Sequence, residues 1–437
     1  MKAEAALHVS RSTQHDPSIP GPETIQRRAY ANGMVVLVKE NFSSPVVVVD
    51  GTLRFGGVNV PREQAGLASF MTDVLMRGTQ QRTFQQLYEE IESVGATLDV
   101  SAGLNVSGFG SKSLAESLPS MIELLADVLQ RPTFPEPEVE KVRGEILTDV
   151  EERANDTRRM AGLTFRELLY PDTHPYSISG LGYAETIRSL TRDDLEQFYR
   201  ARVGAHGMIV AIVGAVKADE AFRLWEDAFG NWAGAPTGSA PIPDAPRLTE
   251  TRRRAVSVPG KTQSDLVLGC IGPRRTAPDY FPAALGNTVL GVFGLNGRIG
   301  EKVRVKGGMA YYAYSSVEGG LGPGAWSVIA GVNPANVDRA VELIRTEIKR
   351  IRDTKVSAKE LADNKAFITG LLPLRLETND GVADQIANME LYGLGLDYLQ
   401  QYTDMINRIT GQQVQAAAQK YLDPAAYALA VAGPANH

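Results

Sequence analysis

The sequence is poor in cysteine and contains no long apolar run. Its single cysteine, Cys270, excludes an internal disulfide framework and a cysteine-rich metal site. Cys270 lies in the apolar segment DLVLGCIG, where a buried and inert thiol is expected rather than a nucleophile. No stretch reaches the ~18 apolar residues that a membrane-spanning helix needs, so we expect no membrane partner.

Histidine and excess positive charge are also scarce. The chain has five histidines, at positions 8, 15, 174, 206 and 437, and no two of them have the spacing of metal ligands. His174 precedes a proline, where we expect it to order a turn. The net charge is -6 and no basic cluster dominates any stretch, so we expect no nucleic-acid partner.

The chain is long enough to form more than one domain. A sequence of 437 residues exceeds what one compact core usually accommodates. We read residues 1–24 as a flexible tail, because they lack the continuous apolar core of a signal peptide. This favours a cytoplasmic protein; an exported form whose signal has been removed stays open. Residues 231–250 are rich in Pro, Gly and Ala and predict a linker between domains at 25–230 and 251–437.

Both halves alternate between apolar runs and helix-like segments. In the first half the pattern predicts strands and helices in this order: strands at 33–40 and 46–57, helices at 63–77 and 84–95, a strand at 96–111, helices at 113–130, 137–170 and 191–202, and a strand at 207–214. Thr191, followed by two aspartates, is a good capping residue for the last of these helices.

The second half repeats this order. Its predicted elements are a strand at 264–272, a helix at 280–294, strands at 309–317 and 325–332, helices at 334–353, 357–379 and 397–422, and a strand at 426–433. A strand, a loop, a helix and a glycine-rich stop therefore recur roughly 215 residues after their first appearance. We interpret the chain as a duplicated α+β domain.

Three segments resemble one known family. They are AGLASFMTDVLMRGT (65–79), the stretch from HPYSISGLGY to VAIVGAV (174–216), and GRIGEKVRVKGGMAYYAYSS (297–316). In this order and separation they are similar to segments of the insulinase/pitrilysin zinc peptidases, the inverzincins with an H-x-x-E-H helix. The likeness is closest to the small two-domain bacterial members, which work as two-chain assemblies. It implies two insulinase-like α+β domains, each a mainly antiparallel sheet packed by helices.

The chain departs from this family at every zinc position. The two zinc histidines of the family fall at Ser69 and Asp73, its general-base glutamate at Thr72, and its third ligand at Asp149. A supporting glutamate falls at Val142. Serine is a poor zinc ligand, and threonine cannot take a proton from water at neutral pH. We therefore expect no metal and no other cofactor in this chain, and zinc in a partner chain.

A plainer interpretation of the same positions stays open. Ser69, Thr72 and Asp73 lie at i, i+3 and i+4, so they could simply form a mildly polar helix face. Asp73 and Asp149 could also hold a hard cation through oxygen, although two carboxylates alone are few ligands.

Two residues of the second half match the substrate-holding pair of the family. Arg304 and Tyr311 have its seven-residue spacing within VRVKGGMAYYAYSS. The resemblance implies that the tyrosine hydroxyl donates to the oxygen that becomes negative as water attacks a peptide carbonyl, and that the guanidinium holds the peptide. On spacing alone, Tyr311 would be one of three tyrosines of a strand, with Tyr312 and Tyr314, and Arg304 a solvated charge.

The strand that begins at residue 96 is the other candidate site. In the family the equivalent edge strand takes up substrate in extended form, through main-chain hydrogen bonds. The resemblance places this role on Ala96, Thr97, Leu98, Asp99 and Val100.

These observations lead to one function and two alternatives. We expect the non-catalytic subunit of a two-chain insulinase-type zinc peptidase, whose paralogous H-x-x-E-H partner carries zinc and whose substrates are unfolded peptides. The alternatives are an inactive scaffold of the same fold and a peptide-binding homodimer that uses the edge strand alone.

Overall fold

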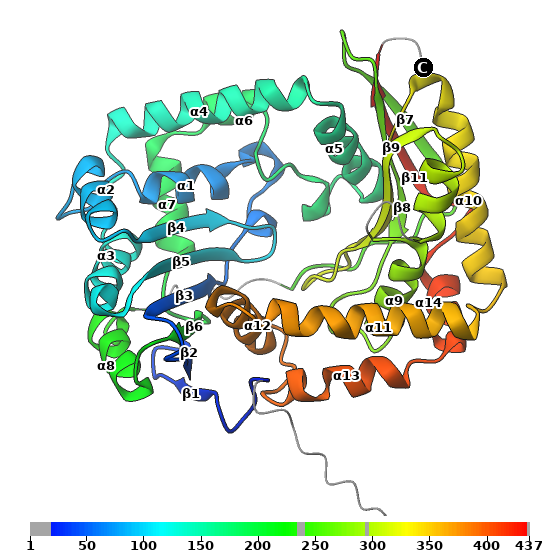
Figure 1. Ribbon diagram of the computed structural model, residues 1–437. Helices are drawn as coiled ribbons and strands as arrows, with labels where there is room; N and C mark the ends of the chain where they lie inside the picture. The colour runs from blue at the N-terminus through cyan, green and yellow to red at the C-terminus, as the bar shows by residue number, and fades with distance from the viewer. Residues whose placement is uncertain (1–18, 234–240, 293–296, 435–437) are drawn as a thin grey trace, which may run out of the picture.

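The apolar runs of the sequence form the inner strands of two mixed sheets, each covered by helices (Figure 1). The computed structural model describes residues 19–233, 241–292 and 297–434. Ile209–Gly214 (β6) and Ser264–Ile271 (β8) are buried along their whole length. Such continuous burial requires helices on both faces of a sheet, and it explains why β6 and β8 from Leu266 onward are apolar without alternation.

The first sheet has six strands in the order β1-β2-β6-β3-β5-β4. Only β2 and β6 run parallel; the other neighbours are antiparallel. The strands besides β6 are Gln26–Ala29 (β1), Val35–Glu40 (β2), Val46–Leu53 (β3), Thr97–Ala102 (β4) and Ser107–Leu114 (β5).

The second sheet has five strands in the order β7-β11-β8-β10-β9. Here β7 and β11 are the parallel pair. The strands besides β8 are Arg252–Ser257 (β7), Ala310–Val317 (β9), Ala325–Val332 (β10) and Ala428–Gly433 (β11).

The two sheets have the same topology, which confirms the predicted duplicated α+β fold. When β2 to β6 are matched in chain order with β7 to β11, the two spatial orders are identical. The helices correspond in the same way, so that α1 matches α9, α4 matches α11 and α5 matches α12. The strands of the two sheets lie on either side of residues 231–250.

The helices have the following bounds. In the first half they are Leu67–Leu75 (α1), Phe84–Ser93 (α2), Leu118–Gln130 (α3), Glu136–Ala154 (α4), Thr157–Leu169 (α5), Ala184–Ser189 (α6), Arg192–Arg202 (α7) and Ala218–Phe229 (α8). In the second half they are Tyr280–Leu290 (α9), Val337–Asp353 (α10), Ala358–Arg375 (α11), Asn379–Leu391 (α12), Tyr398–Arg408 (α13) and Gly411–Tyr421 (α14).

Each half contributes one helix to the sheet of the other half. Helix α5 packs on β8 and β11, and helix α12 packs on β3 and β6 (Figure 1). Ile386 of α12 is fully buried in a cluster with Leu37 and Ala211 of the first sheet, and Phe165 of α5 is buried against Val267 of the second. One face of each sheet is thus completed only by the opposite half.

Two of the predicted helices end earlier in the structure, and each is followed by the helix that packs on the sheet of the other half. The helix predicted at 137–170 is divided into α4 and α5, because the Asp156 side chain accepts a hydrogen bond from the Arg159 amide and starts a new helix. The helix predicted at 357–379 ends at Arg375, and the Thr378 side chain caps α12 by accepting from the Gly381 amide. Both breaks free the following helix to cross to the other sheet.

Two further predicted elements are divided in the structure, and α6, α8, α12, β1 and β7 were not predicted. The single strand predicted at 96–111 is a hairpin of β4 and β5, joined by a turn at 103–106. The helix predicted at 397–422 is divided into α13 and α14 by a capping box at Thr410 and Gln413. In contrast, the predicted cap at Thr191 is confirmed, since its side chain accepts a hydrogen bond from the Asp194 amide.

The tail and the linker are partly packed against the domains. Residues 1–18 of the predicted tail and 234–240 of the predicted linker lie outside the described residues. Within 19–24, Ile19 packs against the cluster that α12 forms on the first sheet. Within 241–250, Ile242 and Leu248 pack against the α5 cluster, and Asp244 forms an ion pair with Arg274. The described part of the linker is therefore anchored rather than free.

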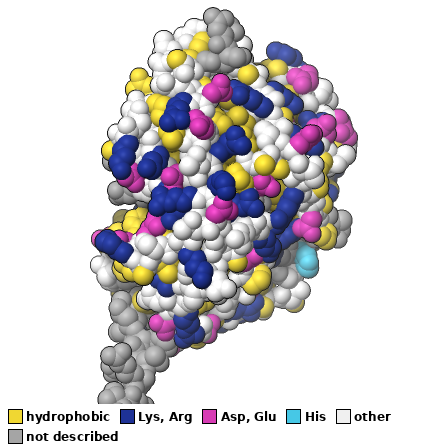
Figure 2. All heavy atoms as spheres, turned by 90° about the vertical axis from the view of Figure 1, so that its right-hand side faces the viewer, with side chains coloured by type: hydrophobic (Ala, Val, Ile, Leu, Met, Phe, Trp, Pro, Cys, Tyr) yellow, Lys and Arg dark blue, Asp and Glu magenta, His cyan; other side chains and the backbone are white. Residues whose placement is uncertain are grey.

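The outer surface of the second half carries mixed charge. Figure 2 shows Lys and Arg side chains interspersed with Asp and Glu on the face that includes α10. Pairs one helical turn apart, Arg339–Glu342 and Lys349–Asp353, account for part of this pattern.

Over the part of the chain that the structure describes, no helix combines the length and apolarity needed to cross a membrane.

Candidate functional site

Helix α1 presents the positions that correspond to zinc ligands in the resembling family. Its start is fixed by Gly66, whose φ of 96° and contact with Ile187 and Gly182 leave no room for a side chain. The Ser69 hydroxyl donates to the Gly180 carbonyl at 2.9 Å. The serine hydroxyl is therefore held within its own chain.

Thr72 takes the position of the general base. It is fully buried, and its hydroxyl donates back to the carbonyls of Ser69 at 2.9 Å and Ala68 at 3.2 Å. Val142, at the position of the supporting glutamate, is buried on the facing helix α4. Neither residue offers a free acceptor for a proton from water.

Asp73 and Asp149 come close enough to interact, since α1 packs on α4. Desolvation raises the pKa of Asp73 to about 6; Glu145 and Asp149 add to this, while Arg77 opposes it. The Asp73 side chain still reaches solvent, and water offsets part of the desolvation. Arg77 itself donates to Glu145 at 2.6 Å, so the strongest local cation is already paired.

This set of donors does not fit zinc. A zinc site needs at least three His, Cys, Asp or Glu ligands, and only Asp73 and Asp149 of the four family positions carry a carboxylate. Across the described residues, no three such side chains are grouped closely enough to hold a metal ion. Arg77 would also repel a cation at this place.

Arg304 and Tyr311 lie on two elements of the second half that pack against each other. Arg304 belongs to a π-helical segment, Gly300–Val305, that packs against β9. Tyr311 is the second residue of β9, and the register with β10 shifts there, so that Tyr312 faces Gly331 and Ala310 faces Val332. Tyr311 is the extra residue of this β-bulge, and it is 73% exposed. Bulges of this kind re-aim a side chain out of the regular alternation.

The side chains of Arg304 and Tyr311 have no hydrogen-bond or ion-pair partner within the described ranges. The exposed Tyr311 and the half-buried Arg304 thus both lack a polar partner in the described residues and can bond to a molecule outside the chain. Neither side chain makes a polar contact with α1 among the described residues.

The two neighbouring tyrosines have a different environment. The Tyr312 hydroxyl donates to Asp265, which also accepts from Thr157 of α5. The guanidinium of Arg158 donates to the Tyr314 hydroxyl and lies 5.1 Å from the centre of the Tyr312 ring. These tyrosines tie α5 to the second sheet, and this role could not be read from their spacing.

The candidate peptide-binding strand is at an edge. Ala96 precedes β4, which includes Thr97, Leu98, Asp99 and Val100 and pairs only with β5 among the described strands. Strand β4 also packs beside α1. In the duplicated topology its counterpart is β9, the strand of Tyr311. The two candidate regions thus occupy the equivalent edges of the two sheets, although on β9 the Ser315 amide already donates to the Gly291 carbonyl.

Two family models match this chain. The model for insulinase (peptidase family M16) covers residues 35–167, and the model for the peptidase M16 inactive domain covers residues 189–367. The chain belongs to the M16 peptidase family. The first model spans β2 to β5 and the helices that carry the zinc positions, and the second spans the segment with Arg304 and Tyr311.

Relatives of the M16 family match along most of the chain. An uncharacterized zinc protease of Mycobacterium leprae is 27% identical over 380 residues, which is 85% of this chain and 83% of that protein. The mitochondrial-processing peptidase subunit beta of Rattus norvegicus is 25% identical over 435 residues, 97% of this chain and 88% of the relative. The non-peptidase homolog YmxG of Helicobacter pylori is 24% identical over 380 residues, with 87% of each chain covered.

Solved M16 structures have the same fold. The peptidase M16 inactive domain from Pseudomonas fluorescens superposes with a TM-score of 0.86 and 24% identity, over 94% of this chain and 98% of that one. A protease from Helicobacter pylori superposes with a TM-score of 0.85 and 19% identity, over 95% of this chain and 100% of the other. This agreement establishes the two-domain bacterial architecture.

Two lesser expectations are also confirmed. His174 orders a turn: its Nδ1 accepts from the Tyr176 amide at 3.1 Å, which leaves Nε2 as the donor to the Pro243 carbonyl at 3.2 Å. Cys270 is buried, and desolvation raises the pKa of its thiol to about 11. A thiol in this state is protonated at neutral pH and inert.

Zinc content is the first testable consequence of the altered M16 positions. We expect the purified chain to retain well under about one zinc per chain after dialysis, because Ser69 and Thr72 are bonded internally and only two carboxylates remain. Elemental analysis measures this, and a fluorogenic peptide assay should show no cleavage by the chain alone. One tightly held zinc that survives a mild chelator would contradict the assignment.

A separate prediction concerns an acidic recess beside the edge strand β4. Desolvation, assisted by Asp384, Asp99 and Asp380, raises the pKa of Asp50 on β3 from 3.8 to about 6. The pKa of Asp50 is higher in the folded state than in the unfolded state, so ionisation of Asp50 lowers the free energy of unfolding. This loss of stability is absent below about pH 4 and complete above about pH 6.

Asp50→Asn should therefore stabilise the protein above about pH 7, on the order of 1–2 kcal/mol, and the gain should vanish as the pH falls to about 4. Urea unfolding across this pH range measures the effect. Asp404→Asn, at an exposed position of α13, is the control and should show no such dependence. A gain that is equal at both ends of the range would show that Asp50 is not responsible.

Proposed function

We propose that this chain is the non-catalytic subunit of a two-chain M16 zinc peptidase. In this proposal a paralogous partner carries the H-x-x-E-H helix and the zinc ion. This chain supplies Arg304 and Tyr311 across the interface and encloses half of the space that receives an unfolded peptide.

One observation carries the proposal. Tyr311 sits on a β-bulge with 73% of its surface exposed, and neither it nor Arg304 has a polar partner within the described residues, whereas the hydroxyls of Ser69 and Thr72 are bonded internally. An exposed tyrosine on an edge strand usually has a cost, because it invites association. Its presence on the element that packs against the segment of Arg304 is understandable if both residues act on a molecule bound between two chains.

The chemistry of the pair suits a peptide carbonyl. A phenol is a neutral donor at pH 7, and it stabilises the charge that develops on the carbonyl oxygen only as the attack proceeds. The guanidinium is always charged and can hold a backbone carbonyl or a side-chain carboxylate in the ground state. The zinc of the partner would supply the activated water.

The edge strands suit the same substrate. An extended peptide could add to β4 through main-chain hydrogen bonds that require no particular side chain. This contribution from Ala96 to Val100 would survive the loss of the zinc ligands, so it is compatible with a non-catalytic chain.

The names of two relatives are consistent with a peptidase whose catalytic and non-catalytic functions belong to different chains. One bears the name of a subunit, the beta subunit of the mitochondrial-processing peptidase, and another is named a non-peptidase homolog. The inactive scaffold and the peptide-binding homodimer remain the alternatives; a scaffold has no chemical reason to keep Arg304 and Tyr311 together.

We further propose a cytoplasmic location, which fractionation of cells producing the full-length protein would test.

Association with a paralogous chain tests the proposal. Co-expressed with an M16 chain that has an intact H-x-x-E-H helix, this chain should form a complex of about twice the subunit mass and bury more than ~2,000 Å², as permanent complexes do. Light scattering after size exclusion measures the mass, and the peptide assay should detect cleavage only in the complex. Separate elution of the two chains at micromolar concentration would reject the heterodimer, and a stable dimer of this chain alone would favour the homodimer.

A further inference from the structure

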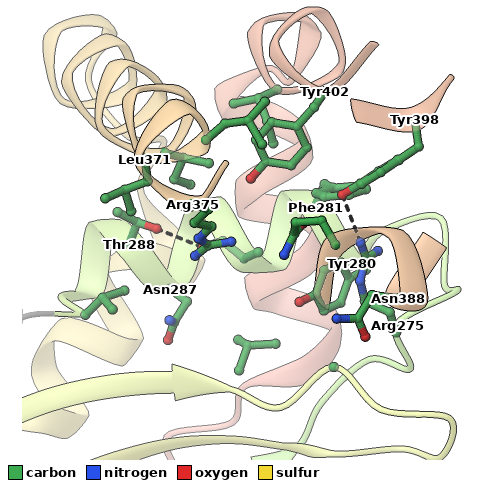
Figure 3. Close-up of a pocket in the computed structure, with 18 of the residues that line it drawn as sticks. Arg275, Tyr280, Phe281, Asn287, Thr288, Leu371, Arg375, Asn388, Tyr398 and Tyr402 are labelled. Atoms are coloured by element: carbon green, nitrogen blue, oxygen red, sulfur yellow. Dashed lines mark hydrogen bonds between the residues drawn. The ribbon is translucent and has the colours of Figure 1, made fainter. Parts of the chain in front are cut away.

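A cavity of about 390 Å³ lies between α9, α11, α12 and α13 in the second half (Figure 3). This volume is within the range of small-molecule sites. The walls combine aromatic rings with polar groups, as Figure 3 shows for Tyr280, Phe281, Tyr398, Tyr402 and Asn388.

The position of the cavity follows from the duplication. Helices α9 and α11 are the counterparts of α1 and α4, the two helices that carry Ser69, Asp73 and Asp149. The second half thus has an open cavity between the same pair of helices that carries the altered zinc positions in the first half. Its lining is basic and aromatic instead of acidic.

The charge of the lining is of one sign. Arg275 and Arg375 both line the cavity, and no aspartate or glutamate does. Arg275 is held in place by the Tyr398 hydroxyl at 2.9 Å, and its guanidinium lies 4.5 Å and 4.9 Å from the ring centres of Tyr280 and Phe281. It contributes positive charge but is already oriented by the protein.

Arg375 differs because no protein group among the described residues pairs with it. In the described residues its guanidinium has no hydrogen bond and no ion pair. Figure 3 shows it extending from the end of α11 over α9, between Thr288 and Phe281. The residue is exposed, so this side of the cavity is open to solvent and a ligand could reach the arginine.

The hydroxyl of Tyr402 is a neutral hydrogen-bond donor in the wall of the cavity. The Tyr402 hydroxyl makes no hydrogen bond within the described part of the chain, and its ring packs edge-on against Phe281 with centroids 6.1 Å apart. Desolvation raises the pKa of Tyr402 to about 12, so the phenol stays protonated and can donate at neutral pH. A guanidinium fork and a phenol beside aromatic walls suit an anion with two oxygens next to an apolar group.

We propose that this cavity binds a carboxylate carried by an apolar or aromatic residue, with Arg375 as the principal contact. Such a group is the C-terminal residue of a peptide, or the same chemistry in a free N-acylated amino acid. The site would capture peptide ends or products at a place that contains no catalytic group. The inference does not depend on a partner chain or on the role of Tyr311.

Calorimetry on the full-length chain tests the inference. N-Acetylphenylalanine should bind at low salt, and N-acetylphenylalaninamide, which lacks the charge, should bind at least about tenfold more weakly, because hydrogen bonds to charged groups contribute about 1.5–3 kcal/mol. A tripeptide that ends in phenylalanine distinguishes the sources: tighter binding than the N-acetyl compound assigns the site to peptide ends, and equal binding assigns it to the free acid.

Substitutions identify the contact. Arg375→Gln should weaken binding of N-acetylphenylalanine at least about tenfold, and Arg375→Lys, which keeps the charge but loses the fork, should weaken it less. Arg408→Gln removes the same charge from an exposed position of α13 outside the cavity and should leave the affinity unchanged. Urea unfolding of each variant verifies that the fold is intact.

Three results would overturn the inference. The first is equal affinity for the acid and the amide, and the second is an equal loss of affinity in Arg375→Gln and Arg408→Gln. The third is no heat of binding for the acid at about 10 mM, because the binding free energy would then be smaller than about 3 kcal/mol. Each is distinguishable from failure of the proposed subunit function, since no partner and no cleavage assay are involved.

Discussion

In the assembled two-chain peptidase, Tyr311→Phe should lower kcat about 10²-fold and change KM little. The substitution keeps the ring on the β-bulge and removes only the hydroxyl. If that hydroxyl donates to the developing oxyanion, its loss acts in the transition state and costs about 3 kcal/mol. Steady-state kinetics of the complex at saturating and limiting peptide separates the two parameters.

Arg304→Ala should have a different kinetic signature. A guanidinium that holds the peptide before reaction contributes to ground-state binding, so KM should rise and kcat should fall. The zinc content of the complex should be unchanged in both variants, because neither residue would coordinate the metal.

The structure determines which tyrosines are suitable controls. Tyr312→Phe and Tyr314→Phe would each remove a hydroxyl bonded to Asp265 or Arg158 and so should lower stability. Tyr88→Phe, on α2 and 40% exposed, is the better control for kcat. A Tyr311→Phe complex no slower than Tyr88→Phe would show that the substrate-stabilising donor lies elsewhere.

The second large effect concerns the exchanged helices. Ile386→Ala should destabilise the whole protein by about 2–5 kcal/mol, the usual cost of truncating a buried isoleucine. Ile386 belongs to the second half but is fully buried against the first sheet. Because α5 makes the reciprocal contact, the two halves should unfold in one transition.

Tryptophan fluorescence can follow the two halves separately. Trp225 is buried in the core of the first half and Trp326 in that of the second. In variants that keep only one of the chain's three tryptophans, Trp225 or Trp326, Ile386→Ala should shift the urea midpoint that each reports by the same amount. Leu374→Ala, on α11 and 64% exposed, is the matched control and should change stability by less than about 0.5 kcal/mol. A shift reported by Trp225 alone would show that the halves unfold independently.

Much of the fold could be predicted because its signals are local. The buried strands β6, β8 and β11 appear as apolar runs that burial on both faces demands. Thr191 predicted the start of α7 because a helix cap is an interaction over three residues. The repeat of strand, loop and helix predicted the duplication that the two identical sheet orders confirm.

The errors arose where a local stop signal interrupts a continuing helical pattern. Asp156 and Thr410 each cap a new helix inside a segment that the sequence predicts as one helix, and Thr378 caps a helix that the sequence pattern did not predict. Whether such a residue caps a helix or lies within one depends on where the following segment finds an apolar surface. For α5 and α12 that surface belongs to the other half.

The sequence by itself determined the M16 resemblance, the duplication and the loss of the zinc-binding residue types, because residue chemistry and spacing are written in the chain. Only the tertiary structure decided that Tyr311 lies on a bulge while Tyr312 and Tyr314 are bonded internally, since exposure depends on register with β10 and on α5. It alone brought Arg275 and Arg375 to one cavity, from positions 100 residues apart. Contacts between distant segments follow from how whole faces are buried, and no local pattern encodes them.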